Sequence, residues 1–343
     1  MRCTGNVSVS CGETLPLLII LQPLAYPSGI APNRLLGLLI YEQDMALFPI
    51  DVIIRTYNRS SMIGDAAASV IAADRTGIAL RLLIVDNNSA DDTPQVLAQI
   101  ARKHGEQIIT ITEKKPGGQM ALNAGIAASH APVLAFFDDD ERVRADWLQT
   151  IRHEMADPAT DFIAGPYKPI WTIPEPEWIP EGFGGVLGII DNGPERRKFG
   201  SGFSGMLTQG NCAVRRTIFD EAGPYPAELE TAEDRWLFEW LMAHGKTGYY
   251  CPDLEIGHLM QADRLKRDYF RSWARREGRD TAVCDRLAQR TAPIKKGWYW
   301  RQRFGDLASL IRKPAGTPEA FAAELNLRQM KSYIAATIFR AGN

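Results

Sequence analysis

The stretch VLAFFDDDE at residues 133–141 places five consecutive apolar residues directly before three aspartates. A short apolar run is typical of a buried strand, and open α/β sheets bind ligands at the carboxyl ends of their strands. Asp138, Asp139 and Asp140 repel one another unless positive charge lies among them. A divalent cation such as Mg²⁺ or Mn²⁺, held together with phosphate oxygens, meets that need. The alternative is a solvated acidic turn.

The sequence before this stretch alternates apolar runs with helical patterns. Strands are predicted at Asp51–Arg55, Leu82–Val85, Ile108–Ile111 and Val133–Phe137. The helices between them end near Ala73, Gly105 and Ser129. The second helix is expected to begin with Thr93 as N-cap and Pro94 at its first position. Such βαβ units predict an α/β fold with a mainly parallel central sheet.

Polar residues also follow the first two predicted strands. Asp86 can accept a hydrogen bond from a ribose hydroxyl or a base N–H, or it forms a local turn with the residues after it. The first strand runs into Thr56, Tyr57, Asn58 and Arg59, of which Arg59 can meet a phosphate. Because these strand ends share one edge of the sheet with the aspartates, we expect a nucleotide site there.

The composition of the 343-residue chain is that of an ordinary globular protein, with 45% hydrophobic and 23% charged residues. The formal net charge of −2 gives no field that attracts nucleic acid, so we expect no nucleic-acid partner. The five cysteines form no C-x-x-C pair and no zinc-ligand spacing, which favours reduced thiols and a cytoplasmic location. They are Cys3, Cys11, Cys212, Cys251 and Cys284.

Residues 1–48 are expected to be a leader, either disordered or an over-long start, because Met45 stands just ahead of the ordered pattern. A weak signal peptide around Leu17–Leu24 is the alternative. That run is the nearest approach in the chain to the roughly 20 apolar residues that span a bilayer.

Two later regions differ in composition from the rest. Residues 161–210 are rich in glycine, proline and tryptophan, which favours a lid or substrate loop. The chain from residue 261 to 343 is expected to be a basic helical extension. Its basic residues are interleaved with aromatic ones, and the Lys295-Lys296 pair precedes Trp298-Tyr299-Trp300. Such helices contact an anionic membrane or a lipid-linked acceptor, or they are solvated faces whose aromatics pack on the domain.

Six segments stand in one order along the chain. They are DVIIRTYNRS (51–60), LLIVDNNSADDT (82–93), GGQMALNAGIAAS (117–129), VLAFFDDDE (133–141), TQGNCAVRR (208–216) and AEDRWL (232–237). Together they resemble the family 2 glycosyltransferases of the GT-A fold. The resemblance implies one Rossmann-like GT-A domain at 49–260, with a nucleotide-binding half at 49–140 and an acceptor half at 141–260.

The resemblance also implies roles for individual residues. The donor-binding residues would be Thr56, Tyr57, Asn58, Arg59, Asp86, Asn123, Asp138 and Asp139. The ligands of the Mn²⁺ or Mg²⁺ on the diphosphate would be Asp140, Asp138 and His258. Asp234 would be the base that deprotonates the acceptor hydroxyl, with Glu233 as the second candidate. Because Thr231–Asp234 approximates a capping box, capping is the structural alternative for Asp234.

Two residues depart from the family pattern, and neither is at a metal or base position. Arg55 stands where many members have proline before Thr56, and Leu122 stands where many have arginine before Asn123.

We therefore expect an inverting, non-processive, metal-dependent glycosyltransferase that moves a sugar from a nucleotide-diphosphate donor to a carbohydrate or lipid-linked hydroxyl. The Q-x-x-R-W signature of processive members is absent. One alternative is a metal-dependent nucleotidyltransferase or phosphohydrolase, which should carry a glycine turn or a nucleophilic aspartate after the first strand. Another is an inactive sugar-binding module, which should lack Asp140 or Asp234.

Overall fold

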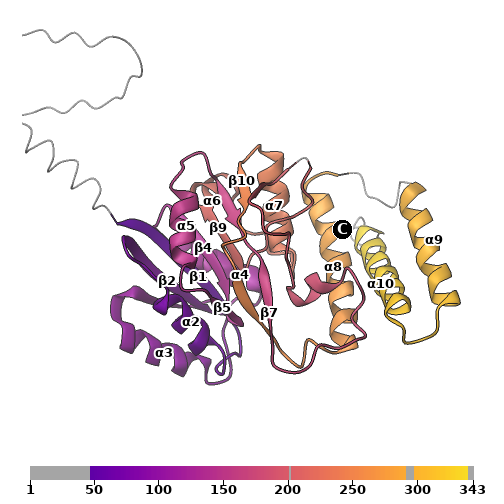
Figure 1. The fold of residues 1–343 in the computed structure, drawn as a ribbon, viewed down its shortest axis with the longest axis horizontal. Helices are drawn as coiled ribbons and strands as arrows, with labels where there is room; N and C mark the ends of the chain where they lie inside the picture. The colour runs from indigo at the N-terminus through magenta and orange to yellow at the C-terminus, as the bar shows by residue number, and fades with distance from the viewer. Residues whose placement is uncertain (1–46, 201, 291–296, 339–343) are drawn as a thin grey trace, which may run out of the picture. The chain divides into compact units, whose positions relative to one another are not determined.

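The computed structural model describes residues 47–200, 202–290 and 297–338 (Figure 1). In this part of the chain, the central sheet has the strand order β3-β2-β1-β4-β9-β6-β10-β8. Its strands are β1 (Phe48–Thr56), β2 (Ile78–Asp86), β3 (Ile108–Thr112), β4 (Val133–Asp138), β6 (Phe162–Ala164), β8 (Arg197–Lys198), β9 (Asn211–Arg215) and β10 (Gly248–Tyr250). The first four are mutually parallel, and β9 runs antiparallel between β4 and β6. The prediction of an α/β fold on a mainly parallel sheet is confirmed.

Helices cover both faces of this sheet, which explains why its strands are continuously apolar. The helices are α2 (Ile63–Ala72), α3 (Thr93–His104), α4 (Gly118–Ala128), α5 (Trp147–Met155), α6 (Thr217–Ala222) and α7 (Glu233–Ala243), with short 3₁₀ turns η1 (Gly105–Gln107) and η2 (Gly184–Leu187). Val52 and Ile54 of β1 pack towards α2, α3 and α5, whereas Ile53 between them packs towards α4, α6 and α7. Each fully buried side chain of this size contributes about 1.5–3 kcal/mol.

A smaller sheet extends the domain beside the carboxyl end of β4. It consists of β5 (Glu141–Val143), β11 (Ile256–Met260) and β7 (Tyr167–Trp171), in the order β5-β11-β7. The antiparallel pairing of β5 with β11 sets His258 directly opposite Glu141. This pairing joins the end of the aspartate cluster to a segment far along the chain.

Two local predictions need correction. Thr93 is not the N-cap of α3; Asp92 occupies that position, and the Thr93 hydroxyl instead accepts a hydrogen bond from the Arg59 backbone N–H at 2.9 Å. Residues 161–210 are not only a loop, because β6 lies in the central sheet and β7 in the smaller one. The expected strand positions and the end of α3 at Gly105 are confirmed.

Three helices follow the sheets: α8 (Arg267–Leu287), α9 (Gly297–Arg312) and α10 (Pro318–Ile338). Phe270 of α8 and Phe321 of α10 are buried together with Leu187 of η2, so the helices pack on the 161–210 region. Arg271 is ion-paired with Glu324 between α8 and α10. The aromatic residues of α8 therefore pack on the domain, which is the second of the two alternatives given for the basic extension.

No helix among the described residues is long and apolar enough to cross a membrane. Residues 1–48 are expected to form a leader. Of these, residues 1–46 lie outside the described part of the chain.

Candidate active site

A cavity of about 530 Å³ opens at the carboxyl ends of β1, β2 and β4. This volume is within the range of ordinary ligand pockets. Its lining is Arg55, Thr56, Tyr57, Arg59, Asn87, Asn88, Lys114, Pro116, Gly117, Gly118, Ala121, Asp138, Asp139, Asp140 and Arg264. Tyr57 is 56% exposed at the cavity, which leaves its ring free to stack on a planar base. Four cations and three aspartates thus share one cavity, and we call it the donor cavity.

The three aspartates each have a cationic or hydroxyl partner. Arg55 Nε donates to Asp138 Oδ1 at 3.1 Å, and the Thr56 hydroxyl donates to Asp139 Oδ2 at 2.8 Å. Asp140 is almost fully buried, and its Oδ2 lies 2.6 Å from Nη2 of Arg264. These partners offset part of the repulsion expected from three adjacent acids.

Two of these aspartates have opposite pKa shifts. Burial and the neighbouring charge of Asp140 raise the pKa of Asp139 to about 7. Burial also acts to raise the pKa of Asp140, but contact with His258 and the charge of Arg264 outweigh it and hold that pKa below its ordinary value. Of these two carboxylates, Asp140 is consequently the one that stays ionised more readily.

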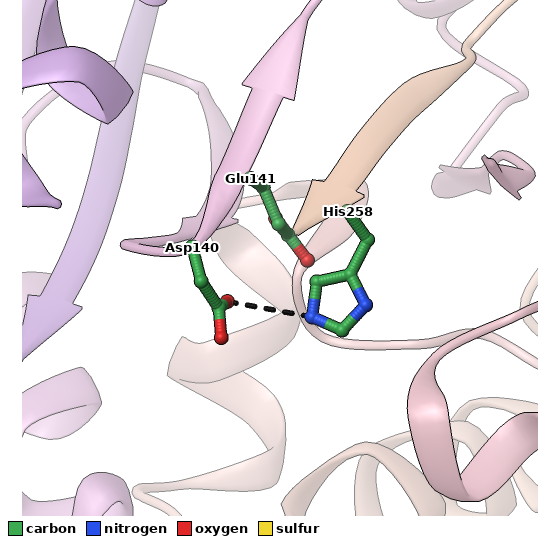
Figure 2. Close-up of side chains that lie close together, drawn as sticks. All are labelled: Asp140, Glu141 and His258. Carbon is green, nitrogen blue, oxygen red and sulfur yellow. Dashed lines mark ion pairs between the residues drawn. The ribbon is translucent and has the colours of Figure 1, made fainter. Parts of the chain in front are cut away.

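A group of potential metal ligands lies at the floor of this cluster (Figure 2). One ligand atom each from Asp140, Glu141 and His258 lies within 4.8 Å of the others. The His258 Nδ1 lies 2.7 Å from the Leu187 carbonyl, which can only accept a hydrogen bond, so Nδ1 donates and Nε2 is the nitrogen that faces Asp140 and Arg264. Two carboxylates and one imidazole form a donor set that fits Mn²⁺ or Mg²⁺.

Two of the three predicted metal ligands belong to this group. Asp140 and His258 are brought together as expected, with Asp140 Oδ1 3.5 Å from His258 Nε2. Asp138 lies outside this group, and Glu141 is its third member. Glu141 directly follows the aspartates in the sequence, and that adjacency was the available signal. Arg264 and Gln261, which both contact Asp140, had no sequence signal at all.

Gly210 allows the backbone to approach these carboxylates closely. A Cβ on Gly210 would lie 2.4 Å from Glu141 Oε1 and 3.0 Å from Asp138 Oδ2, so no larger residue fits without displacing them. The fully buried Asn211 next to it accepts a hydrogen bond from Trp147 Nε1 and donates to the carbonyls of Pro166 and Leu254. The Gly210-Asn211 step thus shapes the acid cluster and ties β9 to its surroundings.

A second cavity, of about 550 Å³, contains Asp234 at the start of α7. The 161–210 region and the three C-terminal helices supply most of its walls. Its lining is Gly185, Ile190, Met206, Thr208, Thr231, Asp234, Arg235, Trp273, Glu277, Gly278, Thr281, Gln302, Arg303, Gln329, Met330 and Tyr333. Burial and the adjacent Glu233 raise the pKa of Asp234 to about 7. We call this space the acceptor cavity.

The capping-box alternative for Asp234 is wrong. Ala232 is the N-cap of α7, and no side chain caps this end. Thr231 instead contacts Asp280 of α8, whose Oδ2 accepts hydrogen bonds from the backbone N–H groups of Glu230 and Thr231. The carboxylate of Asp234 accepts one hydrogen bond, from its neighbour's backbone N–H, and lines the acceptor cavity.

Arg55 connects the donor cavity to the start of α7. Its guanidinium donates to Asp138 in the donor cavity and to the buried carboxylate of Glu233, the residue before Asp234. The second carboxylate oxygen of Glu233 is buried without a hydrogen-bond partner among the described residues. Arg55, one of the two residues that depart from the family pattern, is thus the physical link between the aspartate cluster and α7.

Arg55→Met is expected to lower the free energy of unfolding by about 1.5–3 kcal/mol, because buried Glu233 then loses its hydrogen-bond donor. Urea unfolding at pH 7 measures this change. The double variant Arg55→Met/Glu233→Gln should recover most of the loss, because the unpaired buried charge is gone. Wild-type stability in the single variant would contradict the bridging role.

Three predicted donor-binding residues lie outside the lining of the donor cavity. Asn58 and Asp86 hold the loop after β2, accepting hydrogen bonds from the backbone N–H groups of Ala90 and Ser89. Asn123 of α4 exchanges two hydrogen bonds with the backbone of Tyr225. These side chains support the walls of the site, whereas Thr56, Tyr57, Arg59, Asp138 and Asp139 line it.

Comparison of the sequence with protein families matches the model of glycosyl transferase family 2 over residues 51–223. An uncharacterized glycosyltransferase of Mycobacterium tuberculosis is 35% identical over 106 residues, which is 31% of this chain and 44% of that protein. The glycosyltransferase AglE of Haloferax volcanii is 24% identical over 200 residues, which is 58% of this chain and 62% of that protein. The chain thus spans less than two thirds of the length of these relatives.

Among solved structures, the fold is similar to that of a mannosyltransferase from Pyrobaculum calidifontis, determined in complex with GDP-Man and Mn²⁺. The TM-score is 0.60 at 15% identity, over 85% of this chain and 87% of that chain. This similarity confirms the expected GT-A fold.

Proposed function

Since the chain belongs to glycosyl transferase family 2, we propose that it moves a sugar from a nucleotide-diphosphate donor to a hydroxyl acceptor with inversion of the anomeric carbon. The observation that carries the proposal is the Arg55 bridge, which joins a cavity suited to a nucleotide to Glu233, the residue before a carboxylate with a raised pKa in the acceptor cavity. A donor and an acceptor bound in these cavities would meet beside the bridge.

The donor cavity offers a partner for each part of a nucleotide sugar. Tyr57 stacks on the base, and Asp138 accepts a hydrogen bond from the ribose. Arg59, Lys114 and Arg264 face the diphosphate, whose charge they complement. Asp140 and His258, with Glu141 beside them, would hold a divalent cation, Mn²⁺ or Mg²⁺. When bound, the cation neutralises charge that develops on the leaving diphosphate.

The reaction is a single displacement. Asp234 takes the proton of the acceptor hydroxyl, whose oxygen forms a bond to the anomeric carbon. The bond from that carbon to the diphosphate oxygen breaks on the opposite face, and the nucleoside diphosphate leaves with the electron pair. A base works best when its pKa is near the operating pH, and the raised pKa of Asp234 supports this assignment.

The acceptor is proposed to be a carbohydrate or a lipid-linked hydroxyl. Thr208, Glu277 and Gln329 in the acceptor cavity offer hydrogen bonds to sugar hydroxyls, and Trp273 offers an apolar face. A cytoplasmic location belongs to the same proposal. It is supported by the three cysteines of the described part, Cys212, Cys251 and Cys284, which are buried and unpaired.

The proposal predicts selective stabilisation by one nucleotide sugar. In a thermal-shift panel of UDP-, GDP-, dTDP- and CDP-sugars with and without Mn²⁺, one donor at about 100 times its dissociation constant should stabilise the fold by roughly 2.7 kcal/mol. The corresponding nucleoside monophosphate is the control, because it lacks the diphosphate that the cation and the basic residues contact. A panel in which no donor raises the melting temperature would rule the function out.

A further inference from the structure

Helix α9 exposes its apolar side chains rather than burying them. Phe304 and Ile311 are 67% and 78% exposed, Leu307 is 47% exposed and Trp300 is 39% exposed. Their spacing of three to four residues places all four on one narrow face of the helix. A helix of a soluble domain normally turns such a face to the core, so this face marks a contact site.

The polar face of α9 is the one that packs inward. Arg303 and Asp306 form an ion pair at 3.1 Å, with side chains only 11% and 15% exposed. Arg303 donates to the Asn326 carbonyl of α10, and the Asn326 amide donates to Asp306 Oδ1, each at 3.1 Å. Helix α9 lies beside α10 (Figure 1). These bonds fix the rotation of α9 against α10, so that the apolar face is held outward.

The charge around the apolar face is positive. Arg301 and Arg312 are exposed on one flank of it, exposed Lys313 follows the helix, and Asp306 is the only acid between residues 297 and 313. Because Asp306 is paired inward with Arg303, no negative charge accompanies the exposed basic residues in this helix. Exposed aromatic and aliphatic residues next to a row of cations suit the interface of an anionic bilayer, where apolar groups enter the acyl boundary and cations contact the headgroups.

We propose that α9 docks the protein on an anionic lipid surface through the face formed by Trp300, Phe304, Leu307 and Ile311. The opposite side of the same helix reaches the acceptor cavity, because Gln302 and Arg303 belong to its lining. A docked α9 therefore holds that cavity next to the headgroup region, where a lipid-linked hydroxyl would be presented. Docking itself does not depend on the proposed reaction, since lipid binding needs no donor.

The test is sedimentation of the full-length protein with vesicles of phosphatidylcholine alone or with phosphatidylglycerol added. The wild type should bind the anionic vesicles, with an affinity that falls as salt is raised. Phe304→Gln/Ile311→Gln should weaken this binding by at least about tenfold, because two large apolar side chains no longer enter the lipid. Arg301→Gln/Arg312→Gln should weaken it by about fivefold for each charge.

The matched control is Ile173→Gln/Leu287→Gln, which removes two other exposed aliphatic side chains and should bind as the wild type does. The melting temperature of each variant shows whether the substitution affects folding. Its affinity for a nucleoside diphosphate shows whether the donor cavity is affected. Three results would overturn the proposal: no wild-type binding to anionic vesicles, equal binding to both vesicle types, or undiminished binding by Phe304→Gln/Ile311→Gln. A concentration-dependent dimer that this variant abolishes, in a protein that does not bind vesicles, would assign the face to a second copy of the chain instead.

Discussion

Asp234→Asn is expected to lower turnover by about 10²- to 10⁴-fold, the usual effect of losing a general base. The amide keeps the size of the side chain in the acceptor cavity but cannot take the proton from the acceptor hydroxyl. Donor affinity should be unchanged, because Asp234 does not line the donor cavity. Single-turnover transfer measurements and calorimetry of donor binding separate these two effects.

The same substitution should not destabilise the fold. The pKa of Asp234 is raised to about 7, so its ionised form costs folding free energy, and this cost grows as the pH rises from about 4 towards 7. Asn carries no such charge, so the variant should melt at or above the wild-type temperature at about pH 8. In the wild type, turnover should rise with pH and level off above about 7, as Asp234 ionises.

Thr231→Ala is the control for the neighbouring backbone. Thr231 lines the acceptor cavity, and its hydroxyl contacts Asp280. Because this hydroxyl cannot act as the base, its removal should leave most of the activity. Retention of more than about a tenth of turnover by Asp234→Asn would place the base elsewhere. Glu233 would then be tested as Glu233→Gln.

Asp140→Asn is expected to abolish the dependence of donor binding on a divalent cation. Loss of a residue that hydrogen-bonds to a metal ligand commonly lowers metal affinity by about 10- to 100-fold. Loss of a direct ligand should lower metal affinity by a larger factor. In the wild type, Mn²⁺ should strengthen binding of the nucleoside diphosphate relative to EDTA, because a cation held by Asp140 would offset the negative charge of the phosphates. In the variant the two conditions should give the same affinity. Isothermal calorimetry measures all four values.

Asp146→Asn provides the matched control, because Asp146 is an exposed acid paired with Arg144 on the surface. It should keep the full response to Mn²⁺. If Asp140→Asn also kept that response, the cation would be held by other groups and the assignment of Asp140 would fall.

The sequence alone determined the four parallel strands β1 to β4 and the residues at their carboxyl ends that line the donor cavity. Apolar runs that end in polar residues predicted β1, β2 and β4, and parallel strands bring their carboxyl ends to one edge whatever the rest of the chain does. Thr56, Tyr57, Arg59 and the aspartates therefore lie together as predicted. Local pattern was sufficient there because the helical connections make these strands parallel, so that their carboxyl ends lie at the same edge of the sheet.

Only the tertiary structure decided how distant segments complete the site. His258 faces Glu141 because β11 pairs antiparallel with β5, and Arg55 reaches Glu233 because α7 packs on the sheet beside β4. Neither contact has a periodic signal in the sequence, since each depends on packing between elements that are far apart along the chain. The face of α9 is a further case: its amphipathic spacing is visible in the sequence, but the pairing of Arg303 and Asp306 with Asn326 decides that the apolar side points outward.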